Sequence, residues 1–396
     1  MAREDSRDPP PQIPLIRAAM LVNLDYQPAV AQRAGIGRYT RLLAHYLPAF
    51  MEGDDALRLF YLDFTRRAEP PEAIARAVPK PWRLLPGKVI QQLWKRGLPP
   101  RYDLLSGRAD IFHFPNFIIP PVSKKAKTTV TIFDMSFMRH PECAEARNLA
   151  YMTARIGETV KRADAIITIS KFSADETEAF FPEAKGKTHP LYLGLDQTLL
   201  PPPPETVAET RKRLGLDRPY ILSVGTIEPR KNFAFLVDVF ERLGRDDIDL
   251  VIVGRPGWKC EPTLEKFRTS KAAKNIRHFA STGDGDLAAL YAGASVFALA
   301  SLYEGFGFPP LEAMQCGAPV VSSDGGSLPE VLGEAAEIVH GFDADTWAAA
   351  LARMLGDKGR RAEFATRGKS WARRYRWEDT ARQTYAIYKG IAGGPA

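Results

Sequence analysis

Two glutamates flank a glycine-rich turn in the C-terminal part of the chain. Glu304 opens the segment and Glu312 follows after seven intervening residues; between them the turn runs through Gly305, Phe306, Gly307 and Phe308. Glycines allow a sharp bend, or a close approach of the backbone to a ligand. The prolines that follow, Pro309 and Pro310, fit the first turn of a helix, where a missing N–H costs nothing.

This arrangement suits a phosphorylated sugar. The free N–H groups of the turn and of the helix start form an anion site, most naturally for phosphate. A carboxylate can accept hydrogen bonds from two hydroxyls of a ribose or a sugar, so one glutamate could hold each end of a nucleotide sugar. The alternative is an ordinary helix N-terminus with acidic residues nearby, which the helix dipole favours by itself. Either glutamate alone fits that alternative better, whereas the pair on a glycine–proline frame favours a binding site.

The elements that position these residues are a strand, the turn, a helix and a second strand. Val296–Ala300 is an apolar run rich in β-formers, which predicts a buried strand. The helix is predicted over Pro310–Gln315 and ends at Gly317, a favourable C-terminal cap. Ala318–Ser322 is the next predicted strand. Strands alternate with helices along the rest of the chain, which predicts parallel sheets covered by helices on both faces.

An adjacent Arg–Lys pair supplies a second anion site. A strand predicted over Tyr220–Val224 leads into a turn at Gly225, and Arg230 and Lys231 follow at a helix start. Arginine offers a fork of N–H donors and lysine a point charge, so the pair can clamp a diphosphate. For most such dipeptides the alternative, a pair of solvated surface cations, would hold.

The segment Ser301–Pro319 resembles the donor-site signature of the retaining nucleotide-sugar glycosyltransferases of family 4, which have the two-domain GT-B fold. Three further segments are similar to elements of that family: Gly225–Asn232, Asp164–Ser170 and Gly194–Asp196. The resemblance implies an α/β protein with two Rossmann-like domains, whose parallel sheets face each other across a cleft. It also implies that the anomeric configuration is retained. Neither a metal nor another cofactor is expected, because cationic side chains can stabilise the departing diphosphate and no Asp-x-Asp pair is placed to bind a metal.

The resemblance also implies roles for single residues. Glu312 should hold the ribose, Arg230 and Lys231 the diphosphate, and Glu304 with the backbone of the turn the sugar. The residues expected in catalysis are Glu304, Asp134, Arg230 and Lys231. The residues expected to bind the donor are Gly35, Gly37, Gly225, Gly254, Arg255, Gly305, Phe306, Gly307, Phe308 and Glu312.

The acceptor is expected on the N-terminal domain. Loops at the carboxyl ends of two predicted strands make His113, Asn116, Phe133 and Asp134 candidates, because open α/β sheets bind ligands at that edge. Alone, a histidine on an apolar run such as His113 is more often packed in the core. The family's corresponding strand usually ends His-Asp, and Phe133 stands here in place of that histidine. Phe133 keeps the backbone carbonyl that is thought to help the reaction but lacks the ring nitrogen.

Composition shifts predict the domain boundaries. Residues 1–14 are charged and proline-rich, which predicts a disordered tail. An acceptor-side domain is expected over residues 15–200, and the stiff linker Pro201–Pro204 separates it from a nucleotide-sugar-binding domain over residues 201–375. A last amphipathic helix within residues 376–396 should cross back onto the first domain.

Composition also limits the class of protein. Hydrophobic content of 45% and charged content of 26% are typical of a soluble globular protein. The net charge of +7 favours anionic partners, but no zinc-finger spacing or RNA-binding motif supports nucleic acid. No apolar run is long enough for a membrane span, and the polar N-terminus does not read as a signal peptide. The three separated cysteines, Cys143, Cys260 and Cys316, predict neither a disulfide framework nor a metal site and fit a reducing cytoplasm.

One segment could bring the protein to a membrane. Residues Lys80–Arg101 are predicted to be irregular, and they mix Trp82, Trp94 and aliphatic residues with basic ones, which suits an anionic membrane surface. The alternative, slightly favoured by the pattern alone, is a surface helix that buries its apolar stripe on its own domain.

The expected activity is the transfer of a sugar to a glycan acceptor in surface polysaccharide synthesis. The favoured donor is GDP-mannose, and the acceptor is expected to be lipid-linked. The expected location is the cytoplasm, with peripheral binding to the cytoplasmic face of the membrane as an option. The first alternative is a transferase of the same fold that uses a UDP-sugar as donor. A non-catalytic nucleotide-sugar-binding subunit is the alternative from another class, and a dinucleotide oxidoreductase is disfavoured because the glycine fingerprint around Gly35 and Gly37 is incomplete.

Overall fold

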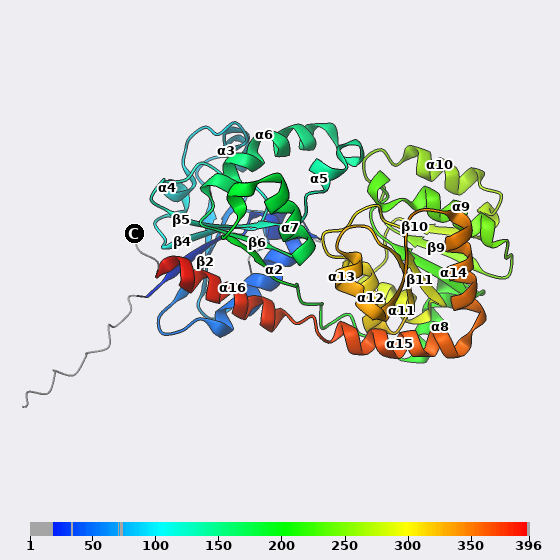
Figure 1. The fold of residues 1–396 in the computed structure, drawn as a ribbon. Helices are drawn as coiled ribbons and strands as arrows, with labels where there is room; N and C mark the ends of the chain where they lie inside the picture. Colours follow the sequence, from blue (N-terminus) through cyan, green and yellow to red (C-terminus); the bar gives the residue numbers. More distant parts are fainter. Residues whose placement is uncertain (1–18, 33–34, 70, 72–73, 394–396) are drawn as a thin grey trace, which may run out of the picture.

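The chain folds into two α/β domains, each built on a parallel sheet with helices on both faces (Figure 1). The structure is a computed structural model that describes residues 19–32, 35–69, 71 and 74–393. The predicted tail, residues 1–14, lies outside these ranges.

The first sheet has seven strands in the order β3-β2-β1-β4-β5-β6-β7. The strands are β1 (Leu21–Asp25), β2 (Ala56–Leu62), β3 (Ala77–Trp82), β4 (Ile111–Phe114), β5 (Lys127–Ile132), β6 (Ala165–Thr168) and β7 (Thr188–Pro190). The helices of this domain are α1 (Gln27–Ala31), α2 (Ile36–Tyr46), α3 (Gly87–Lys95), α4 (Tyr102–Ser106), α5 (Ser136–Arg139), α6 (Ala146–Arg162) and α7 (Lys171–Phe180).

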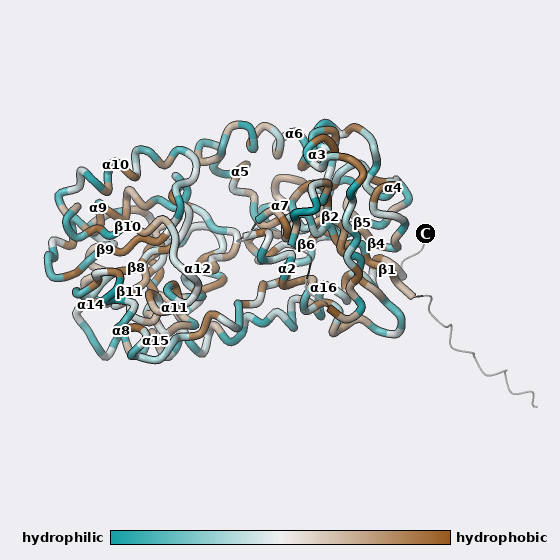
Figure 2. The backbone as a smooth tube through the Cα atoms, turned by 180° about the vertical axis from the view of Figure 1, so that it is seen from behind, coloured by the Kyte–Doolittle hydropathy of each residue, from teal (hydrophilic) through white to brown (hydrophobic). Residues whose placement is uncertain are grey.

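The second sheet has six strands in the order β10-β9-β8-β11-β12-β13. They are β8 (Tyr220–Val224), β9 (Asp249–Val253), β10 (Ile276–Phe279), β11 (Val296–Leu299), β12 (Val320–Ser323) and β13 (Ala336–Val339). The helices that follow the linker are α8 (Pro204–Arg213), α9 (Phe233–Leu243), α10 (Glu261–Thr269), α11 (Asp284–Gly293), α12 (Phe308–Cys316), α13 (Leu328–Leu332), α14 (Ala344–Gly356), α15 (Lys358–Ala372) and α16 (Trp377–Ala392). Figure 2 shows hydrophobic backbone gathered along these strands, as expected for a sheet buried on both faces.

The segment that carries the two glutamates folds as predicted, with a helix one turn longer. Gly307 adopts a φ of 98° at the start of α12, and Gly317 a φ of 89° at its end. Both angles favour glycine, because a side chain in that region of backbone space is strained. The N–H of Gly317 bonds back to the carbonyls of Ala313 and Met314, which closes the helix.

The predicted strand pattern differs from the structure at the edges of the sheets. The edge strand β3 was not predicted, because Pro79 and Pro81 discourage a strand; an edge tolerates them since only one side must bond. Thus Lys80–Arg101 is not irregular but contains the end of β3 and the helix α3. The short edge strand β13 was also not predicted.

The last helix, α16, returns to the first domain and packs on α2. The Tyr388 hydroxyl lies 2.6 Å from Nδ1 of His113 on β4, and the Tyr385 hydroxyl donates to Asp55 at 2.6 Å. Among the described residues, no helix combines the length and apolar character that a bilayer span requires.

The contact between α16 and β4 predicts that removing the Tyr388 hydroxyl lowers the free energy of unfolding. Tyr388→Phe leaves the fully buried Nδ1 of His113 without its partner, which should lower the free energy of unfolding by about 1–2 kcal/mol. Urea denaturation measures the change. The control is Tyr46→Phe, at a half-buried ring that stacks on Trp377, and it should change stability much less. Equal losses in the two variants would contradict this account of the contact.

Candidate functional site

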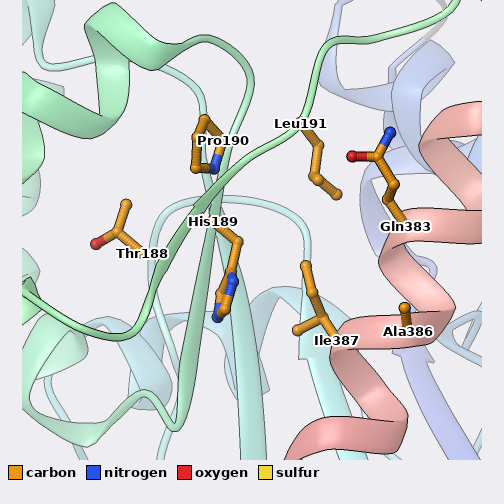
Figure 3. Close-up of a pocket in the computed structure, with 7 residues that line it drawn as sticks. All are labelled: Thr188, His189, Pro190, Leu191, Gln383, Ala386 and Ile387. Atoms are coloured by element: carbon orange, nitrogen blue, oxygen red, sulfur yellow. The ribbon is translucent and has the colours of Figure 1, made fainter.

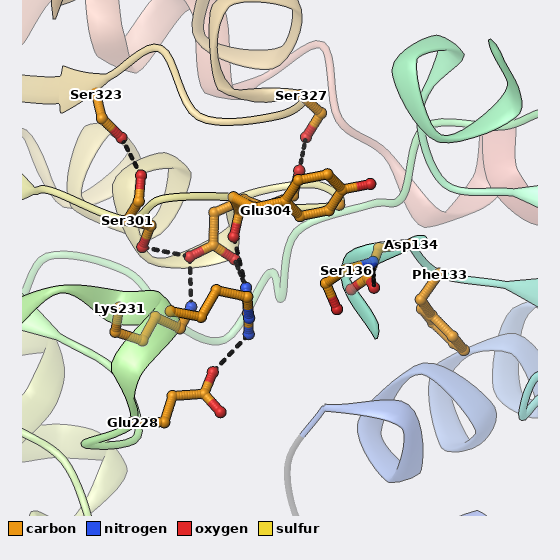
Figure 4. Close-up of polar contacts among 12 residues, drawn as sticks. Phe133, Asp134, Ser136, Glu228, Lys231, Ser301, Glu304, Ser323 and Ser327 are labelled. Atoms are coloured by element: carbon orange, nitrogen blue, oxygen red, sulfur yellow. Dashed lines mark hydrogen bonds and ion pairs between the residues drawn. The ribbon is translucent and has the colours of Figure 1, made fainter. Parts of the chain in front are cut away.

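The glutamate that precedes the glycine turn, Glu304, lies at the centre of a buried ion cluster (Figure 4). Its side chain is buried, with 6% of the residue exposed. Oε1 accepts from Lys231 Nζ at 2.5 Å and from Ser301 Oγ at 2.6 Å, and Oε2 accepts from Arg230 Nη1 at 3.1 Å. Burial alone would raise the pKa of Glu304, but the charges of the two cations outweigh it and lower the pKa to about 2.

The structure therefore brings Glu304, Arg230 and Lys231 together, although the sequence assigned the glutamate to the sugar and the cations to the diphosphate. Arg230 also donates to the carbonyl of Tyr303 and to Oε1 of Glu228, both at 2.7 Å. A guanidinium has five N–H groups and an ammonium three, so both cations keep donors for a further anion.

Glu228 is a member of this cluster that sequence reasoning missed. It is buried, and burial raises its pKa against the opposing charges of Arg230 and Lys231. Its Oε2 has no hydrogen-bond partner among the described residues. The available signal was its position two residues before Arg230 in the turn after β8.

The second glutamate, Glu312, lies on α12 and faces the first domain. Its Oε1 accepts from Arg38 Nη1 at 2.8 Å, and its Oε2 accepts from the Tyr291 hydroxyl at 3.0 Å. Arg38 also pairs with Asp196 at 2.9 Å. Each carboxylate oxygen can accept one more hydrogen bond, so Glu312 retains capacity for a ribose. Arg38 was not predicted, although it directly follows Gly37.

A cavity of about 1620 Å³ lies between the domains at this point. It is lined by Arg38 and Tyr26 of the first domain and by Glu312 and Arg255 of the second. The ion cluster around Glu304 does not line it. The predicted donor residues thus fall into two groups, the cavity group with Glu312 and Arg255, and the buried group with Glu304, Arg230 and Lys231.

The predicted glycines bring backbone segments into close contact. A Cβ on Gly254 would lie 1.8 Å from the carbonyl oxygen of Gly225, so the turns after β8 and β9 touch. A Cβ on Gly37 would lie 2.0 Å from the carbonyl oxygen of Gln32, and Gly35 adopts a φ of 59°. A Cβ on Gly305 would lie 2.4 Å from the carbonyl oxygen of Phe133, across the domain boundary.

Phe306 and Phe308 pack against each other, with ring centroids 5.0 Å apart. Phe306 is buried, so it supports the turn rather than offering a ring to a ligand. The turn leads directly into α12, as predicted, and Phe308 is the first residue of that helix.

The acceptor-side candidates lie in three different environments. Phe133 and Asp134 lie at the end of β5, opposite the Glu304 cluster (Figure 4). Asn116 is exposed. His113 has no exposed surface, and its two ring nitrogens lie within hydrogen-bond distance of the hydroxyls of Tyr388 and Thr131. The expectation that His113 contacts an acceptor is therefore wrong; it is a packed core histidine, and burial lowers its pKa to about 3.

A smaller cavity of about 320 Å³ lies between β7 and α16 (Figure 3). Its lining includes His189, Leu191 and Gln383, and it contains none of the predicted site residues. Within the described ranges, no group of histidine, cysteine and acidic residues is arranged to hold a metal ion.

The ion cluster predicts an acid-dependent loss of stability. Since the pKa of Glu304 in the folded state is about 2, its ionised form contributes stability that is present above the ordinary glutamate pKa and is lost as the pH falls toward 2. Glu304→Gln leaves two buried cations with one partner fewer, which should cost about 3 kcal/mol at neutral pH. The difference in free energy of unfolding between wild type and variant should become smaller as the pH falls below about 4.5, near the pKa of a glutamate in the unfolded state. Denaturant titrations across that range measure it.

The matched control is Glu334→Gln, which makes the same change at an exposed carboxylate. A Glu304→Gln variant as stable as this control would show that the cluster does not hold the turn.

The comparisons with solved structures show the fold. Sucrose-phosphate synthase from Thermosynechococcus elongatus has a TM-score of 0.71 at 19% identity, over 94% of this chain and 99% of that one. WaaG, a glycosyltransferase involved in lipopolysaccharide biosynthesis, has a TM-score of 0.70 at 15% identity, over 95% of this chain and 100% of that one. The expected GT-B architecture, two Rossmann-like domains with parallel sheets, is confirmed.

Sequence relatives and a family model agree with that fold. O-antigen chain mannosyltransferase B from Escherichia coli is 32% identical over 283 residues, which cover 70% of this chain and 74% of that protein. MMP alpha-(1->4)-mannosyltransferase from Mycolicibacterium hassiacum is 34% identical over 245 residues, 57% of this chain and 54% of that protein. Residues 207–371, which contain both Glu304 and Glu312, match the model of the glycosyl transferases group 1 family. The chain belongs to this family and is a glycosyltransferase of the GT-B fold.

Proposed function

We propose that the protein transfers mannose from GDP-mannose, with retention of configuration, to a polyprenyl-linked glycan during surface polysaccharide synthesis. The observation that carries the proposal is the Glu304–Lys231–Arg230 cluster, which lies at the carboxyl ends of β8 and β11 in the domain matched by the family. The names of the O-antigen and MMP mannosyltransferases support mannose as the sugar and a glycan as the acceptor.

In this proposal the donor lies on the second domain. Glu312 binds the ribose, the remaining N–H groups of Arg230 and Lys231 bind the diphosphate, and the turn from Gly305 to Phe308 binds the sugar. Negative charge develops on the diphosphate as it departs, and cations aimed at that charge stabilise the transition state. Two cationic side chains and the start of α12 supply this stabilisation, so we propose that the reaction needs no metal.

The acceptor is proposed to approach from the first domain, where Phe133 and Asp134 end β5. Asp134 Oδ1 accepts from the Ser136 N–H at 2.8 Å, which fixes the carboxylate at the edge of the interdomain boundary. A carboxylate held there can orient an acceptor hydroxyl toward the donor sugar. Substitution on the same face of the sugar then retains the configuration without a covalent intermediate.

Nucleotide binding gives the first test of this assignment. GDP should raise the melting temperature of the protein, because a ligand that binds only the folded state at about a hundred times its Kd adds roughly 2.7 kcal/mol. A thermal-shift screen against GDP, UDP, ADP and NAD measures it. Stabilisation by UDP instead of GDP would exclude GDP-mannose and keep the fold-based mechanism. Stabilisation by NAD alone would overturn the transferase site.

Transfer itself tests the diphosphate clamp. Arg230→Lys keeps the charge but removes the fork of donors, and it should lower kcat for release of GDP from GDP-mannose in the presence of acceptor by about 100-fold. The control is Arg242→Lys on the exposed part of α9, which should leave kcat unchanged. A folded wild type that binds GDP but transfers nothing to any polyprenyl-linked glycan would favour the non-catalytic subunit.

We also propose that the first domain binds the cytoplasmic face of an anionic membrane, where such an acceptor would lie. Of the residues that the sequence pattern singled out in Lys80–Arg101, the exposed aliphatic and basic ones carry this proposal and the two tryptophans do not. Trp82 and Trp94 are half-buried against their own domain, and Trp94 Nε1 donates to the carbonyl of Pro100 at 2.6 Å. Both tryptophans thus pack on their own domain, Trp94 from the helix α3 and Trp82 from the end of β3.

The exposed residues around them form what we call the apolar-basic surface. Six of the eleven exposed large hydrophobic residues of the described chain lie in it, so the clustering is local: Val78, Leu84, Leu85, Val89, Leu98 and Leu104. Exposed cations are interspersed: Lys80, Arg83, Lys88, Lys95, Arg96 and Arg101. Leu84 is 74% exposed in the loop before α3. Aliphatic side chains surrounded by cations complement an anionic bilayer, since one group enters the interface and the other pairs with headgroups.

Liposome flotation tests the apolar-basic surface. Leu84→Ser with Leu85→Ser should weaken binding to phosphatidylglycerol-containing vesicles about tenfold or more, since burial of each side chain in the interface contributes about 1.5–3 kcal/mol at most. Lys80→Gln with Lys88→Gln should weaken it by about 1 kcal/mol per cation. The control, Leu200→Ser with Phe342→Ser, changes exposed apolar residues elsewhere. Binding that is equal in all variants, or equal on purely zwitterionic vesicles, would exclude this surface.

A further inference from the structure

The first turn of α7 is held by a carboxylate from the other domain. Glu330, on α13 of the second domain, accepts from the backbone N–H groups of Lys171 and Phe172 of the first, each at 2.7 Å and each with a separate oxygen. Burial, and next the neighbouring carboxylate of Glu330, raise the pKa of the Tyr192 hydroxyl to about 12. The first N–H groups of a helix have no partner within the helix and carry its positive dipole end, so a carboxylate with two such bonds is a strong link.

Two serines of the same turn link the domains a second time. Ser170 Oγ accepts from the Ser173 N–H at 3.1 Å, which caps α7, and donates to the carbonyl of Gly305 at 2.8 Å. Ser173 Oγ lies 3.1 Å from the carbonyl oxygen of Phe133 and 3.3 Å from that of Gly305. Both serines are fully buried. The hydroxyls therefore connect the donor turn of one domain with the end of β5 in the other.

The surroundings of these bonds are close-packed. A Cβ on Gly305 would lie 2.4 Å from the Phe133 carbonyl oxygen and 2.8 Å from the Cβ of Asp134, so the turn can approach this closely only with glycine. Beside it, the Met135 N–H donates to the hydroxyl of Tyr303 at 3.2 Å. The contact places the turn that precedes α12 directly against the proposed acceptor side.

We propose that Glu330, Ser170 and Ser173 are positioning residues for sugar transfer: they clasp α7 to the second domain and thereby set the distance between the Gly305 turn and the Phe133–Asp134 end of β5. None of the three needs to touch a substrate. They act through the Gly305 carbonyl and through the relative position of the two domains. The proposal rests on the proposed function for its kinetic consequence, but the clasp itself is a property of the ligand-free chain.

Glu330→Gln tests the clasp. An amide can accept from only one of the two N–H groups and turns its own NH₂ toward the other, so the closed arrangement should loosen. We expect kcat for transfer to fall about tenfold, the effect of a change of about 1.4 kcal/mol. The Kd of the nucleotide that stabilises the wild type should change less than about twofold, because the side chains proposed to bind it, Glu312, Arg230 and Lys231, all lie on the second domain. Small-angle scattering should give a larger radius of gyration for the variant.

The control is Glu334→Gln, which removes the same charge from an exposed carboxylate four residues further along the chain. Ser170→Ala with Ser173→Ala provides a second variant that leaves Glu330 intact and should also lower kcat without weakening the nucleotide. Wild-type values of both kcat and the radius of gyration in Glu330→Gln would overturn the clasp. A wild type without transferase activity would overturn the proposed function instead, and the scattering comparison would still decide the clasp.

Discussion

The arrangement of the second domain around its cleft depends on the burial of Glu304 with two cations. Ions removed from water are costly, and the cost is offset only when geometry is good and the remaining lone pairs and protons are satisfied. Here Glu304 accepts from Lys231, Arg230 and Ser301. Arg230 also donates to Glu228 and to a backbone carbonyl. The cluster therefore ties the turn after β8 to the turn after β11. Because these turns follow neighbouring strands, one set of ion pairs fixes the edge of the sheet at which a ligand would bind.

A cluster without net charge does not by itself attract an anionic ligand, but the protonation of one of its carboxylates would give it a net positive charge. Two cations face two carboxylates, Glu304 and Glu228, so the cluster has no excess positive charge when all four groups are ionised. Burial raises the pKa of Glu228, and one of its oxygens has no hydrogen-bond partner in the described part of the chain. The ionised form of Glu228 is thus less stabilised than that of Glu304, whose pKa the two cations lower. The arrival of a diphosphate would favour its protonation, which would leave a net positive charge where the phosphate binds.

Much of this site could be predicted from the sequence because local rules determine it. Prolines and glycines specify the turn and the start and end of α12. The sequence pattern also correctly identified strands β8, β11 and β12. Contacts between distant segments could not be predicted in this way. Arg38 reaches Glu312 across 274 residues, and Glu330 reaches α7 across 158 or more. His113 illustrates the same limit. A histidine on an apolar strand is more often packed in the core than part of a site, and the contact that places it in the core comes from Tyr388, on the distant last helix.

The replacement of the family histidine by Phe133 is best understood from its neighbours. The ring of Phe133 lies edge-on to Tyr39, with centroids 5.0 Å apart, and 5.6 Å from Phe117. Such a pocket favours an apolar ring, because an imidazole there would lose hydration and gain only aromatic packing in return. The backbone carbonyl points the other way, toward Ser173 and the Gly305 turn. A side chain chosen for packing and a carbonyl presented to the opposite domain are therefore compatible at one residue. If the carbonyl is the group that the reaction uses, then the clasp at α7 matters more to this chain than the ring nitrogen that it lacks.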